Sequence, residues 1–161
     1  MKTLLVYYSL EGNTEFAAQT AAEAADIDLE RLVPEKEPPK AGFGKFFWGG
    51  KSVVMKETPA LAPLKFDPAN YDSIILAFPI WASSYPPAIA SYIKDHGLNG
   101  KDCFIIACSA GGNAQKAFDK LAGKLPGCNI KATLSLIDPA KDKEKNAALI
   151  KEFIGKNIPR E

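Results

Sequence analysis

Short apolar runs recur along this chain, and each has the length of a strand rather than of a helix. Continuous apolar runs of this kind are typical of parallel strands that are buried on both faces of a sheet. The last run, Ile130–Ile137, alternates apolar and polar positions more clearly, which indicates an edge strand. The pattern therefore predicts five strands, over residues 4–6, 27–33, 73–78, 103–108 and 130–137.

Helical patterns fall between these runs. The first is an Ala-rich stretch without Gly or Pro, and Pro86 and Pro87 suit the first turn of the second. The predicted helices cover residues 16–25, 86–96, 114–125 and 143–157. Five strands joined by helical crossovers predict an α/β protein with a doubly wound parallel sheet and right-handed connections. A ligand of such a sheet lies beyond the carboxyl ends of the strands.

One crossover differs from the others. Residues 34–63 hold five of the 12 prolines and four of the 12 glycines, which disfavours a long regular helix there. An aromatic cluster lies between them, formed by Phe43, Phe46, Phe47 and Trp48. We expect an irregular loop with a short helical turn that packs these rings over one face of the sheet. A lid or a dimer contact is the alternative.

Composition narrows the class of protein. A chain of 161 residues and 17.4 kDa predicts a single domain over residues 1–161, and a net charge of +1 points to neither nucleic acid nor a membrane as the partner. No window approaches 18 apolar residues, so a membrane span is not expected. The three cysteines, Cys103, Cys108 and Cys128, lack C-x-x-C spacing. They predict buried thiols in a reducing compartment, and therefore a cytoplasmic protein.

The turn after the first strand carries the most informative chemistry. Ser9, Asn13 and Thr14 place polar side chains in it, and Gly12 lets the backbone fold close to a ligand. The first amides of the following helix have no intrahelical acceptor and lie at the positive end of the helix dipole. The turn therefore predicts a phosphate site. The alternative is an ordinary capped helix, with Asn13 or Thr14 as the N-cap.

Two further loops follow strand ends at the same edge of the predicted sheet. Residues 79–87 read Pro-Ile-Trp-Ala-Ser-Ser-Tyr-Pro-Pro and offer aromatic faces held by prolines, with small residues that expose backbone amides. Residues 109–113 read Ser-Ala-Gly-Gly-Asn and let the backbone approach the edge of a flat ligand. Together with the phosphate turn, these loops predict a site for a planar, phosphorylated cofactor that forms hydrogen bonds.

The turn at residues 9–14 resembles the phosphate loop of the flavodoxin family, written S/T-x-T-G-x-T, and the other two loops resemble that family's flavin-binding loops in order and spacing. The resemblance covers the chain apart from residues 34–63. It implies a flavodoxin-like sheet with the strand order 2-1-3-4-5, and FMN as the cofactor with Trp81 near its isoalloxazine ring. The cofactor-binding residues that it implies are Ser9, Leu10, Glu11, Gly12, Asn13, Thr14, Pro79, Ile80, Trp81, Ala82, Ser83, Ser84, Ser109, Ala110, Gly111 and Gly112.

Three features depart from the family pattern. Glu11 stands where the family has a hydroxyl residue, and a carboxylate aimed at a phosphate would repel it, so Glu11 must point outward or the site is weakened. The second flavin loop lacks the tyrosine that covers the ring in electron carriers, for which the nearest candidates are Tyr85 and the Trp48 region. The chain also lacks the strong acidity of those carriers. These features favour a relative whose flavin face is open to a substrate.

Other chemistries fit the sequence less well. Residues 50–52, Gly-Lys-Ser, end like a P-loop, but Lys45 stands where that motif requires a glycine. Ser109 lies in a partial nucleophile-elbow pattern, but the sole histidine, His96, precedes it, against the chain order of that fold. One histidine and scattered cysteines predict no metal site. A receiver domain would need an aspartate at the end of the third strand, where this chain has Phe78 and Pro79.

The sequence leaves three functions open. The first is an FMN-binding protein that passes electrons to or from a redox partner protein. The second is an NAD(P)H-dependent quinone or flavin reductase, and the third is an interaction module that kept the fold without the flavin. In the first two, the flavin performs the electron chemistry and no catalytic side chain is expected. The expected state is a monomer or a homodimer.

Overall fold

The computed structural model describes residues 1–37, 50–51, 58–111 and 113–159. Its centre is a five-stranded sheet in which every pair of neighbours is parallel, in the order β2-β1-β3-β4-β5. The predicted α/β fold and strand order are confirmed. The strands are β1 (Thr3–Tyr7), β2 (Asp28–Arg31), β3 (Ser73–Pro79), β4 (Asp102–Ser109) and β5 (Asn129–Ile137).

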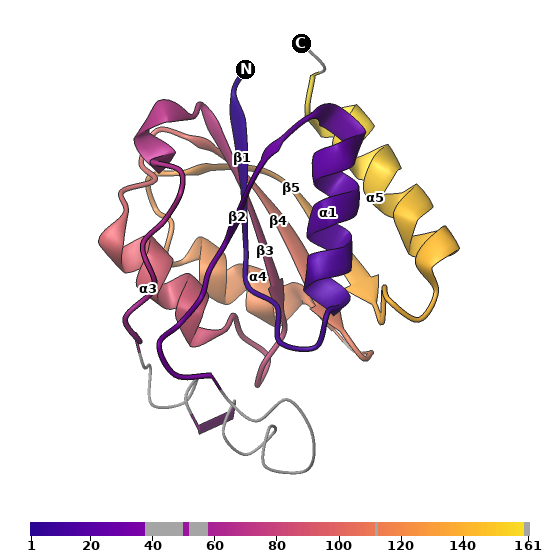
Figure 1. Ribbon diagram of the computed structural model, residues 1–161, viewed down its shortest axis with the longest axis horizontal. Helices are drawn as coiled ribbons and strands as arrows, with labels where there is room; N and C mark the ends of the chain where they lie inside the picture. The colour runs from indigo at the N-terminus through magenta and orange to yellow at the C-terminus, as the bar shows by residue number, and fades with distance from the viewer. Residues whose placement is uncertain (38–49, 52–57, 112, 160–161) are drawn as a thin grey trace.

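Helices cover both faces of this sheet, as Figure 1 shows. On one face lie α1 (Asn13–Ala25) and α5 (Lys143–Asn157), which pack against each other. On the other face lie α3 (Pro87–Asp95) and α4 (Gln115–Ala122). A short 3-10 turn, η1 (Pro68–Asn70), precedes β3. The carboxyl ends of the strands all point to one edge of the sheet, toward the bottom of Figure 1.

Two apolar cores follow from the alternation of side chains along the strands. Leu4 and Val6 of β1 belong to the core beneath α3 and α4, whereas Leu5 belongs to the core beneath α1 and α5. In β3 and β4 nearly every residue is buried, as expected for strands covered on both faces. In β5 alternate positions are exposed, so the predicted edge strand is confirmed.

Element boundaries differ from the predicted ones where loops take over the backbone. The second strand is shorter than residues 27–33. The Leu32 amide still donates to the Tyr7 carbonyl at 2.8 Å, but the chain then turns away from β1, and Pro34 pairs with Leu61 in an isolated antiparallel bridge. Helix α4, predicted over residues 114–125, ends at Ala122. Beyond it, the amides of residues 124 and 125 donate to carbonyls three residues back, which tightens the chain out of the α-helix.

The irregular crossover is described only in part. Residues 38–49 and 52–57 lie outside the described residues, so the predicted role of the aromatic cluster around Trp48 stays a prediction. The segment that leads from the crossover to β3 is held by Glu30, a buried residue of β2. Glu30 Oε2 accepts hydrogen bonds from the amides of Lys65 at 2.7 Å and Phe66 at 2.9 Å. Within the described ranges, no helix has both the length and the apolar character needed to cross a membrane.

The three cysteines are free thiols, as predicted. Cys103 and Cys108 are buried in β4, and Cys128 is half-buried just before β5. Burial raises the pKa of the Cys103 and Cys108 thiols. Both therefore stay protonated at neutral pH and contribute to the core as small apolar side chains.

Candidate functional site

A cavity of about 310 Å³ lies at the carboxyl ends of the strands. It draws on all three loops that the sequence indicates, and it also receives one residue from the crossover and one from the loop after β5. The described residues that line it are Ser9, Leu10, Glu11, Asn13, Thr14, Gly50, Pro79, Ile80, Trp81, Ala82, Cys108, Ser109, Ala110 and Asp138.

The turn between β1 and α1 ends in a glycine cap. Gly12, at φ 102°, is the N-cap of α1, so the alternative with Asn13 or Thr14 as the cap is wrong. The Gly12 amide donates to Ser9 Oγ at 3.2 Å, and the first helical bond runs from the Phe16 amide to the Gly12 carbonyl at 3.0 Å. The amides of residues 13–15 precede that bond and have no acceptor within the helix.

Thr14 is the decisive side chain of this turn. It is 1% exposed, and its Oγ1 has no hydrogen-bond partner in the described part of the chain. Burial raises the pKa of the Cys108 thiol to about 12, and the nearby Thr14 hydroxyl acts in the opposite direction and lowers it. The two groups are therefore neighbours, but their contact does not have the geometry of a hydrogen bond. A buried hydroxyl at a helix N-terminus, with a neutral thiol beside it, is arranged for an anionic ligand.

The loop after β5 forms a wall that sequence reasoning missed. Asn13 Oδ1 accepts from the Ala140 amide at 3.0 Å, and the Asp138 amide donates to the Ser109 carbonyl at 2.8 Å. Asp138 lines the cavity and pairs with Lys141 at 2.9 Å. A signal was present, because Asp138 directly follows the carboxyl end of a predicted strand, and ligands of doubly wound sheets lie beyond those ends.

The loop after β3 presents an aromatic wall. Trp81 and Ser84 exchange two backbone hydrogen bonds, at 3.0 and 2.9 Å, with Ala82 and Ser83 between them at φ 47° and 55°. The Trp81 ring packs edge-on against Tyr8, with centroids 5.5 Å apart. Ser83 and Ser84 do not belong to the cavity wall, and the Ser84 amide is used within the turn. This loop therefore contributes Ile80, Trp81 and Ala82 to the cavity wall.

The end of β4 contributes Ser109, and the loop that follows contributes Ala110. Ser109 Oγ is buried and has no hydrogen-bond partner among the described residues. Gly111, at φ 144°, lies beyond the cavity wall, and Gly112 lies outside the described residues. Tyr85, a candidate to cover the ligand, instead packs its ring against Phe78 at 6.5 Å between centroids. No described side chain of this loop covers the cavity.

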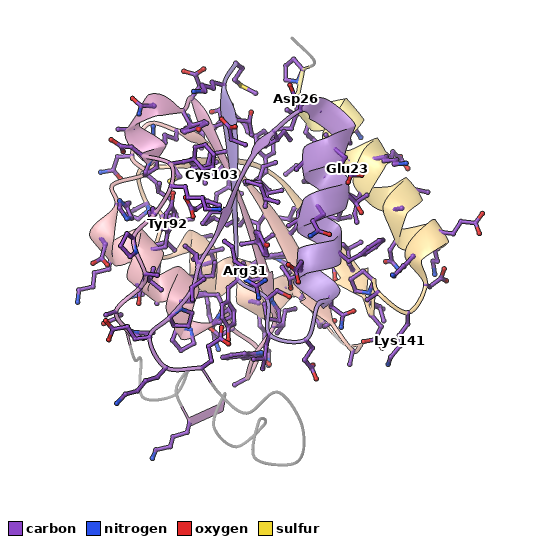
Figure 2. All side chains as sticks on the ribbon, in the orientation of Figure 1. Glu23, Asp26, Arg31, Tyr92, Cys103 and Lys141 are labelled. Carbon is purple, nitrogen blue, oxygen red and sulfur yellow. The ribbon has the colours of Figure 1, made fainter. Side chains whose placement is uncertain are left out.

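The charges around the cavity are uneven. Among the described residues that line it, Glu11 and Asp138 carry negative charge and none is Lys, Arg or His. Arg31 lies behind the turn, where Figure 2 shows it beside the start of α1. It pairs with Glu15 at 2.9 Å and donates to the Ser9 carbonyl at 3.4 Å. An anion in the cavity would therefore depend on neutral donors and helix amides rather than on a cationic side chain.

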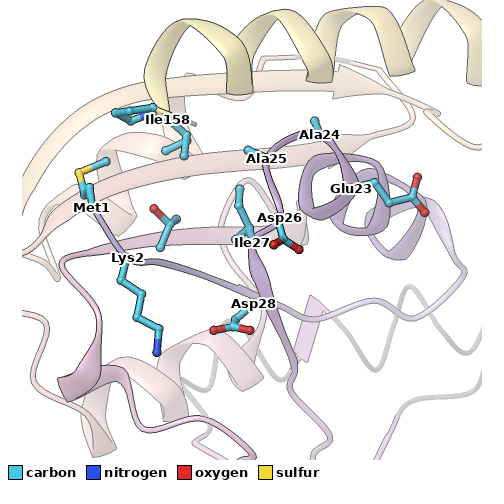
Figure 3. A pocket seen from close by; sticks show the side chains of 11 residues that line it. Met1, Lys2, Glu23, Ala24, Ala25, Asp26, Ile27, Asp28 and Ile158 are labelled. Atoms are coloured by element: carbon cyan, nitrogen blue, oxygen red, sulfur yellow. The ribbon is translucent and has the colours of Figure 1, made fainter. Parts of the chain in front are cut away.

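A larger cavity of about 570 Å³ lies elsewhere, between the C-terminal ends of α1 and α5 and the start of β1. Figure 3 shows Glu23, Asp26 and Asp28 around it. This cavity is at the amino ends of the strands, whereas ligands of doubly wound sheets lie at the carboxyl ends. Its hydroxyl, that of Thr3, is already bonded to Ser73 at 2.7 Å. We therefore place the functional site at the smaller cavity.

Comparison with known families agrees with this geometry. The family model described as flavodoxin matches residues 2–153. The chain belongs to the flavodoxin family. Membership implies a flavin cofactor. A separate finding concerns metals: within the described residues, no group of three His, Cys, Asp or Glu side chains is placed to hold a metal ion.

Solved structures of other flavodoxin-like proteins share the fold. A candidate flavoprotein from Bacteroides uniformis ATCC 8492 is 29% identical, with a TM-score of 0.76, over 95% of this chain and 97% of that one. A flavoprotein from Lactobacillus acidophilus NCFM, crystallised with FMN, is 22% identical, with a TM-score of 0.73, over 88% and 97%. An NADH:FMN oxidoreductase in its apo form is 15% identical, with a TM-score of 0.59, over 97% and 88%. No curated protein matches the chain.

Proposed function

We propose that this flavodoxin-family protein binds FMN in the cavity at the carboxyl ends of the strands and passes electrons through it. The observation that carries the proposal is the buried Thr14 hydroxyl at the start of α1, which has no hydrogen-bond partner among the described residues. A buried hydroxyl without a partner is costly, and a phosphate supplies both the acceptor and the negative charge that a helix N-terminus favours.

The residues of the cavity fit the two parts of FMN. The Ser9 to Thr14 turn would hold the phosphate with the amides that begin α1 and with the Thr14 hydroxyl. Trp81 would present its indole to the planar ring, and backbone groups near Ala82 and Ala110 would meet the ring edge. When bound, the flavin supplies the electron-transfer chemistry, while the protein orients it and excludes water.

An electron carrier is our preferred role, with a redox partner protein as donor or acceptor. The described residues that line the cavity include no Lys, Arg or His that could pair with the phosphates of a nicotinamide cofactor. The exposed Ala110 leaves the cavity open on its side, and this supports a second candidate, an NAD(P)H-dependent quinone or flavin reductase. A monomer or homodimer in the cytoplasm fits both.

The FMN proposal is tested by comparing FMN with riboflavin, which lacks the phosphate. Thr14→Val keeps the shape of the side chain and removes its hydroxyl, so the affinity for FMN should fall by about 1.5–3 kcal/mol, roughly 10- to 100-fold. Riboflavin affinity should stay unchanged, and the control Thr14→Ser should bind FMN nearly as the wild type does. Both ligands can be titrated by quenching of flavin fluorescence. Equal wild-type affinity for FMN and riboflavin would refute the phosphate assignment.

The two roles are separated by the electron donor. For a carrier, NADH and NADPH should reduce the bound flavin negligibly, whereas a ferredoxin-type reductase should reduce it readily, as followed by bleaching of the visible flavin absorbance. Fast reduction by either nicotinamide, with turnover of a quinone, would instead establish the reductase. The variant Ala110→Tyr should then block turnover by covering the ring, while FMN still binds.

A further inference from the structure

Ser109 Oγ is one of four buried side-chain polar atoms that have no hydrogen-bond partner in the described part of the chain. The others are the hydroxyls of Tyr8, Thr14 and Tyr92. Both tyrosines belong to the core beneath α3 and α4, and neither is among the described residues that line the cavity. Thr14 belongs to the phosphate turn. The Ser109 hydroxyl is therefore a second orphan group at the cavity, and the phosphate does not explain it.

The backbone around Ser109 is fixed from both sides. The Ser109 carbonyl accepts from the Asp138 amide at 2.8 Å, and the carbonyl of the preceding Cys108 accepts from the Ile80 amide at 2.8 Å. The loops after β3 and β5 therefore both fix the backbone at this end of β4, and with it the position from which the Ser109 side chain projects. The residue that follows, Ala110, has no polar side chain to satisfy it.

The alternation of β4 separates the two orphan hydroxyls. Cys108 belongs to the core beneath α1 and α5, on the side where Thr14 lies against its thiol. Ser109 is the next residue in the strand, so its side chain points to the opposite face. That face carries the core against which Trp81 packs. The Ser109 hydroxyl therefore lies on the indole side of the cavity, away from the phosphate turn.

We propose that the Ser109 side-chain hydroxyl forms a hydrogen bond with a heteroatom of the flavin ring. This contact selects for a ring with a polar atom at that position, and it contributes affinity that does not depend on the phosphate. The inference rests on the proposed function and goes beyond the backbone contacts that the family resemblance implies for this loop. Serine both donates and accepts, so it can pair with a ring nitrogen or with a ring carbonyl. Ser109 is then a specificity-determining residue for the ring, as Thr14 is for the phosphate.

The test uses three probes that remove the ligand's parts in turn: FMN, riboflavin and lumiflavin, which is the ring without its side chain. Ser109→Ala should weaken all three by the same factor, roughly three- to tenfold, as expected for loss of one hydrogen bond. The control Ser109→Thr keeps the hydroxyl and should retain most of the affinity. Thr14→Val should weaken FMN alone. The ligand-free Ser109→Ala protein should unfold at the same urea concentration as the wild type or a higher one, since no protein hydrogen bond is lost.

Each outcome separates the inference from the proposed function. Equal riboflavin affinity of Ser109→Ala and wild type overturns the role of the hydroxyl, while a loss of FMN affinity in Thr14→Val leaves the proposed function standing. A loss in Ser109→Ala that is confined to FMN also overturns the inference, because the hydroxyl would then meet the phosphate. A wild type that binds none of the three probes overturns the proposed function itself.

Discussion

At the scale of single residues, the phosphate turn depends on a glycine whose conformation is unfavourable for any other residue. Gly12 caps α1 at φ 102°, and a Cβ added there would meet nothing within 4 Å. A larger side chain would therefore fit in the space around Gly12, and the need for glycine comes from the backbone conformation. The turn brings Ser9 Oγ onto the Gly12 amide and leaves the next amides for a ligand.

Replacing this glycine should therefore destabilise the protein through strain alone. We expect Gly12→Ala to lower the free energy of unfolding by about 1–2 kcal/mol, because an L-residue disfavours this region. The matched control is Gly155→Ala, on the exposed side of α5, where a Cβ also meets nothing. That substitution should raise the free energy of unfolding by about 0.5–1 kcal/mol, because alanine favours the helix. Urea unfolding measures both, and effects of the same sign would contradict this account.

At the scale of elements, one buried carboxylate joins β2 to the chain that returns from the crossover. Glu30 is 3% exposed, and its Oε2 accepts two backbone amides, those of Lys65 and Phe66. The two elements are more than 30 residues apart in sequence, so no local propensity holds them together. This carboxylate fixes the chain on its way to β3, one of the strands whose ends form the cavity.

We expect Glu30→Gln to lower the free energy of unfolding by about 1.5–3 kcal/mol, since it keeps the shape and removes the charge that strengthens two hydrogen bonds. The control Glu152→Gln, exposed on α5, should change it by less than about 0.5 kcal/mol. Urea unfolding of the two variants beside the wild type gives both values. If Glu30→Gln matched its control, the carboxylate would not be what holds this crossover.

At the scale of the whole molecule, burial keeps several acidic groups neutral. It raises the pKa of Cys108 to about 12, and it also raises the pKa of Tyr8 and Tyr92. An unfolded chain ionises these groups near their ordinary values of about 9 for cysteine and 10 for tyrosine. Their contribution to stability is therefore complete below about pH 9 and falls progressively as the pH rises above about 9, where the unfolded chain begins to ionise.

Urea unfolding at pH 7, 9 and 11 should therefore give a free energy of unfolding that is level up to pH 9 and then falls. Tyr8→Phe is the matched variant, because the Tyr8 hydroxyl is buried without a partner in the described residues. It should be at least as stable as the wild type at pH 7 and should lose less stability at pH 11. An unchanged alkaline loss in this variant would show that Tyr8 does not contribute to it.

The sequence by itself determined the elements and the three loops that line the cavity. Apolar runs defined β3 and β4 because strands buried on both faces have few polar positions, and this information is local. The Ser9 to Thr14 turn could also be predicted from local sequence, because its glycine, its hydroxyl side chains and the start of its helix are neighbours in the chain. The parallel sheet then placed the loops together, because parallel strands end at one edge.

The tertiary structure alone decided how those loops are joined and which polar groups stay unpaired. Asn13 meets the Ala140 amide across 127 positions, and no local pattern contains that contact. Asp138 lines the cavity because the end of β5 pairs with Ser109 at the end of β4. The hydroxyls of Thr14 and Ser109 have no partner within the described ranges, and this depends on every neighbour that could have formed a hydrogen bond with them. Such a property belongs to the packed molecule, because burial and hydrogen-bond satisfaction are set by residues distant in the chain.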